Sequence, residues 1–159
     1  MAPMRTGELW LRSALWIVLG WWIGGWALFA FVVARTAFRV LPSTQIAGQL
    51  VAPVLAALHL YGAAAGIALA ALAWALARGG TAIWLPLAMS AVCLVSHFGV
   101  TAQIEAIRDL AFGPEGTQEI ALRFQHLHRL SMALYTSVGL GGYALLWVHA
   151  RADAAPDPR

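Results

Sequence analysis

Long runs without a formal charge constrain this chain more than any other feature of its sequence. Residues 13–34 contain no Asp, Glu, Lys or Arg, and residues 40–77 form a second, longer run of the same kind. About 20 apolar residues are enough for a helix to cross the hydrocarbon core of a bilayer. The first run is too long for the apolar core of a signal peptide, which is about 7–15 residues. Both runs therefore predict retained membrane-spanning helices.

The composition also indicates that lipid surrounds much of the chain. Hydrophobic residues make up 61% of the 159 residues and charged residues 11%, which leaves too little polar surface to cover a soluble globule. The ten basic residues are all arginines, scattered at the ends of apolar runs, an arrangement that suits lipid headgroups and not nucleic acid. The single cysteine, Cys93, excludes an internal disulfide or a site built from several cysteines of one chain.

Four helices account for the whole pattern. Pro42 precedes Ser43 and Thr44, either of which can cap the start of a second helix, and two glycines at 79–80 predict a tight turn. The fold class predicted is an all-α integral membrane bundle of four antiparallel transmembrane helices in one domain, residues 1–150. The expected helices are residues 10–36, 44–77, 82–108 and 120–149, followed by a disordered polar tail, 151–159.

Small residues indicate where helices approach each other. Gly20 and Gly24 stand four apart in the first helix, and the second has a face of small residues, Ala56, Ala63 and Gly66, with Gly62 alongside. Small residues on one face allow close contact between membrane helices. We expect both sets to pack helices; the same faces would also suit a partner protein or a second copy of the chain.

Four crossings place both termini on one side, which we call side A; the opposite side is side B. The arginines divide equally between the two sides, so the positive-inside rule does not orient the chain. Arg5 and Arg12, ahead of the first helix, favour cytoplasmic termini. Tryptophans collect toward side A, as anchors at one interface do.

Polar side chains collect toward side B. His97, Thr101, Glu105 and Arg108 follow spacings of four, four and three, which puts them on one stripe of the third helix. In the segment before the fourth apolar run, the two histidines of HLH lie about 200° apart, and we expect His128 to be the one facing inward. These groups predict a polar pocket open to side B, formed by Arg39, Gln49, His97, Glu105, Arg123, His128, Arg129 and Ser131.

Three hypotheses compete for this cluster. In the structural hypothesis, Glu105 pairs with Arg123 or Arg129, and the histidines form hydrogen bonds with backbone carbonyls or serines of neighbouring helices. In the transport hypothesis, Glu105 and His97 carry protons along a pathway, and no cofactor is needed. The third is a membrane redox subunit, in which haem or a transition metal is bound by His59, His97 and His128.

Enzymatic hydrolysis is disfavoured by the motifs. The sequence has no nucleophile elbow, no HExxH and no glycine-rich phosphate loop. A non-enzymatic protein is expected.

Two segments resemble a known family. GGWALFAFVVARTAFRVLPSTQIAG (24–48) and FQHLHRLSMALY (124–135) are similar to the bacterial four-helix membrane proteins of unknown function related to animal transmembrane protein 205. Tyr135 stands in the neighbourhood where that family commonly has an asparagine. The resemblance implies an integral protein of the bacterial inner membrane and supplies no established reaction. The matching positions are Phe38, Arg39, Leu41, Pro42, Ala47, Gly48, Leu127, His128 and Ser131.

Together, these observations predict a transporter-like or accessory membrane subunit. Its expected partners are the lipid bilayer and either another membrane protein or a second copy of the chain. A structural subunit of a larger membrane complex is the further alternative.

Overall fold

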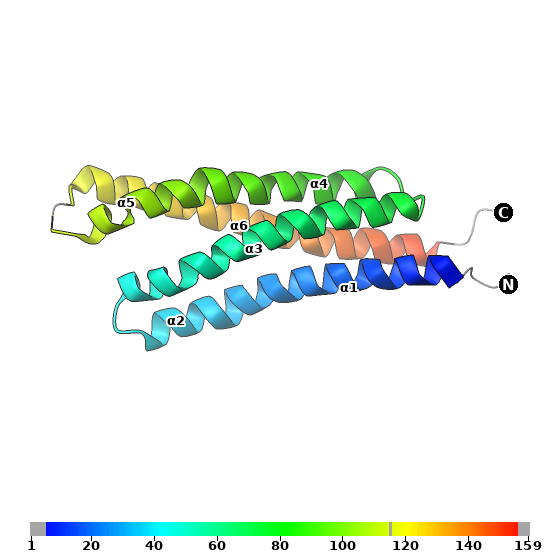
Figure 1. Cartoon of the computed structure of the whole chain (residues 1–159), viewed down its shortest axis with the longest axis horizontal. Coiled ribbons are helices and arrows are strands. Elements are labelled where there is room, and N and C mark those ends of the chain that lie inside the picture. Colours follow the sequence, from blue (N-terminus) through cyan, green and yellow to red (C-terminus); the bar gives the residue numbers. More distant parts are fainter. Residues whose placement is uncertain (1–5, 115, 156–159) are drawn as a thin grey trace.

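The chain folds into four long helices that lie side by side and alternate in direction (Figure 1). The computed structural model describes residues 6–114 and 116–155. Four helices are long and apolar enough to cross a membrane: Thr6–Val40, Thr44–Ala75, Thr81–Phe112 and Gln118–Ala154. The predicted fold class, an all-α membrane bundle of four spans, is confirmed.

The first and third spans each contain a π-helical segment. The first consists of α1 (Thr6–Leu28), η1 (Phe29–Val33) and α2 (Ala34–Val40). The third consists of α4 (Thr81–Leu94), η2 (Val95–Thr101) and α5 (Ala102–Phe112). The second and fourth spans are single α-helices, α3 (Thr44–Ala75) and α6 (Gln118–Ala154). A π segment widens one turn and so changes which residues face the bundle afterwards.

Side-chain caps fix where two helices begin. The Ser43 hydroxyl accepts a hydrogen bond from the Ile46 amide at 3.2 Å, as its position after Pro42 predicts. The Thr117 hydroxyl accepts one from the Ile120 amide at 3.3 Å and starts α6. Both caps satisfy amides that have no partner within the helix.

The fourth helix ends later than expected. It continues to Ala154, so residues 151–154 are helical where a disordered tail was predicted. The reason is an ion pair of Asp153 with arginines on two other segments, which a local composition argument does not detect. Residues 156–159 of the predicted tail lie outside the described part of the chain.

The main core lies in the side A half of the bundle. All four spans contribute to it through side chains that are at most 5% exposed: Leu15, Leu19, Leu69, Met89 and Leu145. Here α3 and α4 are in close contact, because Gly66 has no side chain and the Ser90 hydroxyl donates to the Ala63 carbonyl at 2.9 Å. By contrast, a methyl group added at Gly20 or Gly24 would meet no neighbouring atom within 4 Å, so this pair makes no close contact with another helix of the described chain.

Toward side B the bundle divides into two arms (Figure 1). The first arm is α2 packed on the beginning of α3, residues 44–56. The second arm is α5 packed on the beginning of α6, residues 118–130, around the small core of Val100, Ile104 and Leu127. The ribbons of the two arms therefore lie apart at the side B end of the molecule (Figure 1).

Exposed tryptophans place the bundle in the bilayer. Trp10, Trp74, Trp84 and Trp147, one from each span, are 65–75% exposed near the side A end. Tryptophan prefers the membrane–water interface. At about 1.5 Å per residue, Glu105 lies about 31 Å along its helix from Trp84, which is close to the thickness of the hydrocarbon core. The arms thus emerge from the hydrocarbon at side B, near Glu105.

Candidate functional site: a pocket between the two arms

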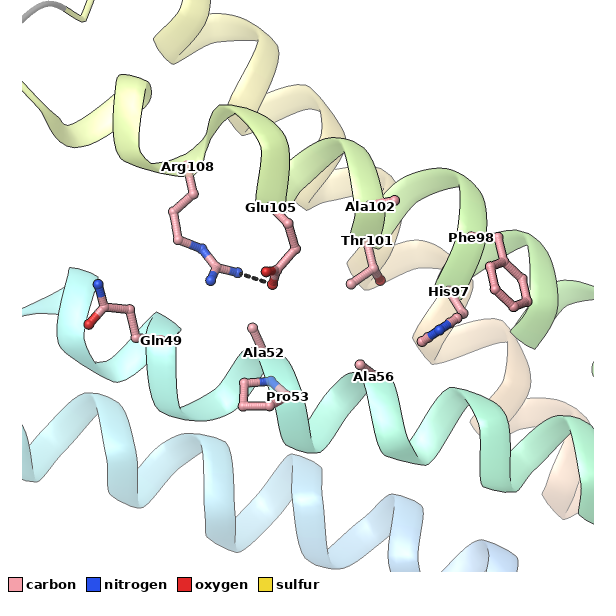
Figure 2. A pocket seen from close by; sticks show the side chains of 10 residues that line it. All are labelled: Gln49, Ala52, Pro53, Ala56, His97, Phe98, Thr101, Ala102, Glu105 and Arg108. Carbon is pink, nitrogen blue, oxygen red and sulfur yellow. Dashed lines mark hydrogen bonds and ion pairs between the residues drawn. The ribbon is translucent and has the colours of Figure 1, made fainter.

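A cavity of about 560 Å³ lies where the two arms separate (Figure 2). One wall is the first half of α3, and the other is η2 with α5. The walls approach each other near Ala56 and His97, and they diverge toward Gln49 and Arg108 (Figure 2). The volume is in the range of small-molecule binding sites, about 300–1,000 Å³. The lining residues are Gln49, Ala52, Pro53, Ala56, His97, Phe98, Thr101, Ala102, Glu105 and Arg108.

The η2–α5 wall of the pocket carries most of its polar groups, and the α3 wall is apolar except for Gln49. Every third or fourth residue of the η2–α5 wall carries a polar group, and α3 contributes Ala52, Pro53 and Ala56 opposite them. The Arg108 guanidinium donates to the Glu105 carboxylate at 2.9 Å, and both side chains point toward α3 (Figure 2). Glu105 is about half exposed, so the pair stands at the wet end of the pocket.

The narrow end of the pocket contains polar atoms that the protein leaves unpaired. His97 Nδ1 and Thr101 Oγ1 are buried and have no hydrogen-bond partner among the described residues. Buried polar atoms in proteins are nearly always hydrogen-bonded to the protein, to water or to a ligand. A polar ligand or water could therefore form hydrogen bonds with these two unpaired atoms at the narrow end.

Three of the eight predicted pocket residues line this cavity: Gln49, His97 and Glu105. The others lie elsewhere. Arg39 is in the exposed last turn of α2, and Arg129 is exposed on α6. Arg123 donates to the Gln103 side chain at 3.4 Å, and Ser131 is buried in α6. The expected pairing of Glu105 with Arg123 or Arg129 is replaced by its bond to Arg108 on the same helix.

His128 does not face inward as expected. It is exposed, and its ring stacks on Phe124 with centroids 6.2 Å apart. The inward positions of α6 here are Leu127 and Ser131, both buried. Successive residues of a helix are rotated by about 100°, so Leu127 at the centre of the inner face turns His128 away.

The histidines proposed for a metal are only partly brought together. His59 is buried in α3, and His97 lies in η2, a segment in contact with α3, where it lines the pocket. His128 is on the exposed surface of the second arm. In the described residues no group of three or more histidine, cysteine, aspartate or glutamate side chains is arranged to hold a metal ion.

Comparison with known sequences places the chain in a family. A sequence model described as "Domain of unknown function (DUF4149)" matches residues 17–112, which is more than half of the chain. The chain belongs to the DUF4149 family. No curated protein and no solved structure matches it. The matched region of this DUF4149 protein extends from the first span to the end of α5 and includes every residue that lines the pocket.

The DUF4149 chain has a second polar cluster, at side A, that sequence reasoning missed. The Asp153 carboxylate pairs with Arg78 and, at 3.3 Å, with Arg12, and it accepts a hydrogen bond from Trp16 Nε1 at 2.9 Å. Arg78 also contacts His149 Nδ1 at 2.8 Å. A detectable signal was present: His149 and Asp153 are four residues apart and therefore share one face of a helix.

Proposed function

We propose that this integral membrane protein binds a small amphipathic molecule in the pocket between its two arms and acts as a transporter-like or accessory subunit. The observation that carries the proposal is the 560 Å³ pocket at the side B boundary of the bilayer. Its Glu105–Arg108 pair can bind a polar group at the wet end, and its alanines and Phe98 can accommodate an apolar part. A ligand would enter from side B or laterally from that leaflet.

A filled pocket tests this proposal. Ala102 lines the cavity and Ala106, one turn further along α5, does not; both are exposed. Ala102→Phe should occupy the cavity without overpacking a core, whereas Ala106→Phe adds the same ring outside it. Native mass spectrometry of protein extracted in lipid nanodiscs should find a small molecule bound to the wild type and to Ala106→Phe and absent from Ala102→Phe. Equal retention by all three proteins, or by none, would contradict ligand binding in this pocket.

In the transport version of this proposal, Glu105 and His97 carry protons. Glu105 is exposed at the pocket entrance, and His97 lies about 12 Å further into the membrane along the same helix. Proteoliposomes loaded with a pH-sensitive dye should show a proton flux that Glu105→Gln abolishes. A flux that Glu105→Gln leaves unchanged would remove Glu105 from the mechanism.

A haem- or metal-binding redox subunit is the second candidate, favoured by two histidines, His59 and His97, on segments that are in contact, α3 and η2. Protein purified from native membrane should then show a Soret band or stoichiometric metal. Both signals should disappear in His59→Ala and in His97→Ala, and a colourless, metal-free preparation would reject this candidate. Constant co-purification with other subunits would instead support a structural role in a larger complex.

We also infer a relation to animal transmembrane protein 205 and a location in the bacterial inner membrane with cytoplasmic termini. The relation is supported by the segments 24–48 and 124–135, and the orientation by Arg12 ahead of the first span. The orientation is checked by fusing a reporter to the carboxyl terminus. This reporter is fluorescent only in the cytoplasm. A fluorescent fusion is expected, and a dark but membrane-inserted fusion would reverse it.

A further inference from the structure

The polar groups of the pocket form one edge that runs from its mouth to its narrow end. Arg108, Glu105, Thr101 and His97 project from successive turns of the η2–α5 segment toward α3 (Figure 2). At about 1.5 Å per residue, this edge extends for roughly 16 Å along the helix axis. A ligand that fills the pocket therefore meets hydrogen-bonding groups along its whole length and not at one end alone.

The facing edge, on α3, is apolar beyond Gln49. Ala52, Pro53 and Ala56 line the α3 wall, and their side chains contain no polar atom. Hydrocarbon packed against these residues leaves no hydrogen bond unmade, whereas a hydroxyl or a charged group there would lose its water without gaining a partner. The pocket therefore differs in polarity from one wall to the other as well as from one end to the other.

The narrow end is unsuited to the hydrocarbon tail of a ligand with one polar end. Thr101 is 8% exposed and lines the pocket, and its hydroxyl oxygen has no hydrogen-bond partner among the described residues; the same is true of His97 Nδ1. Hydrocarbon placed against these atoms would leave both of them unpaired, which costs free energy. A hydroxyl group on the ligand both donates and accepts, so it can pair with the Thr101 hydroxyl and with either tautomer of the His97 ring.

The mouth of the pocket supplies a partner for one polar terminus. The Arg108 guanidinium donates to the Glu105 carboxylate at 2.9 Å, and an arginine carries further N–H groups beyond the one in this bond. The Arg108 side chain is mostly buried, whereas that of Glu105 is about half exposed. Arg108 is therefore the member of the pair that an acceptor on the ligand, such as a carboxylate, would bind.

We propose that the pocket binds a facially amphipathic molecule, which has hydroxyl groups along one edge and hydrocarbon along the other. The hydroxyls face Thr101 and His97, the hydrocarbon edge packs on the alanines of α3, and a terminal acceptor binds Arg108. This inference rests on the proposed function, because it specifies the ligand class of the same pocket. An amphiphile with one polar end and a hydrocarbon tail fits less well, since its tail would cover the unpaired atoms at the narrow end.

Two steroid acids that differ in their hydroxyl groups test the ligand class. Cholate carries its hydroxyls on one face of a rigid skeleton that ends in a carboxylate, and cholanate has the same skeleton and carboxylate without the hydroxyls. The full chain is placed in phosphatidylcholine nanodiscs assembled from dodecyl maltoside, and empty nanodiscs correct for partition into lipid. Mass spectrometry quantifies the bound acid over a range of concentrations. The wild type should bind cholate more tightly than cholanate, although cholanate is the more apolar of the two.

A single hydroxyl on the protein provides the decisive comparison. Thr101→Val keeps the shape of the side chain, and it should weaken cholate binding about fivefold to tenfold through the loss of one hydrogen bond, while cholanate binding stays within about twofold. Thr136→Val is the matched control, because Thr136 is exposed on α6 and its hydroxyl donates to the Met132 carbonyl of its own helix. It should change neither affinity. Equal losses for both acids in Thr101→Val, no loss for cholate, or a wild type that does not bind cholate would overturn the ligand class.

Ala102→Phe separates this inference from the proposed function. Filling the pocket should abolish the binding of both acids. If Ala102→Phe blocks both acids while Thr101→Val does not discriminate between them, the pocket binds amphiphiles and the facial class is rejected. Binding of both acids that survives Ala102→Phe would reject the pocket as the binding site, and both proposals with it.

Discussion

At the scale of single residues, Asp153 joins three segments that are far apart in the sequence. Its carboxylate lies between Arg12 of α1 and Arg78 of the α3–α4 turn, and it also accepts from the Trp16 ring N–H. The Arg78 side chain is only 8% exposed, so it depends on this partner. The charges at side A therefore hold the ends of the bundle together, while the Glu105–Arg108 pair at side B stays within one helix.

Asp153→Asn should lower the stability of the folded bundle. The substitution leaves the mostly buried Arg78 without its counter-charge, and breaking such a pair costs about 1–3 kcal/mol after allowance for the partly exposed carboxylate. Glu105→Gln breaks an exposed pair within one helix and should cost about 0–1 kcal/mol. Thermal unfolding in detergent, followed by circular dichroism, compares the two variants. A smaller loss in Asp153→Asn than in Glu105→Gln would contradict this account of side A.

Histidines show what the sequence could predict at this scale. Counting residues from the helix ends predicts that His59 and His97 lie at similar depth, and the structure places them on two segments that are in contact, α3 and η2. The inward orientation of His128 was wrong because the phase of α6 is set by Leu127 and Ser131, which pack against other helices. Depth follows from chain length along a helix, but rotation about the helix axis follows from packing with residues distant in sequence.

At the scale of elements, the contact between α3 and α4 depends on one glycine. A Cβ atom on Gly66 would lie 2.5 Å from the Pro86 carbonyl oxygen and would also collide with the Ser90 hydroxyl.

The π segments, the interruption of two spans and the true ends of the helices were not predictable from apolar runs. A π segment adds a residue to a helical turn, and in η2 this segment contains His97 and Thr101, which line the pocket.

Gly66→Ala should therefore destabilise the α3–α4 contact. Forcing the helices apart costs about 1–3 kcal/mol, which exceeds the gain in helix propensity of about 1 kcal/mol from replacing a glycine with alanine. Gly24→Ala, where nothing lies within 4 Å of the added methyl, should be neutral or slightly stabilising. The difference in unfolding temperature between the two variants measures the effect. Equal temperatures would mean that α3 and α4 are less tightly packed than the structure shows.

At the scale of the whole molecule, the distribution of polar and apolar side chains divides the bundle into two halves. The side A half is closed by a core to which all four spans contribute, and the side B half divides into two arms with the pocket between them. The long apolar runs were sufficient to predict four spans, because each must satisfy its backbone internally in lipid. The separation of the arms could not be predicted, since it depends on how α3 and the η2–α5 segment diverge beyond Ala56 and His97.

Water access to the narrow end of the pocket tests directly whether the pocket between the two arms is hydrated. In a Cys93→Ala background, a single cysteine replaces either His97, which lines the pocket, or Leu60, which lies at similar depth and is 46% exposed on the outer surface. A charged, membrane-impermeant thiol reagent is then added to one side of oriented vesicles, and labelling is read by mass spectrometry.

We expect His97→Cys to be labelled from side B and not from side A, and Leu60→Cys to be labelled from neither side because lipid covers it. Thiolates react only where water reaches them, so labelling reports hydration and not mere exposure of the side chain. Failure to label His97→Cys from either side, in protein shown to be folded by its unfolding temperature, would contradict a hydrated pocket between the arms.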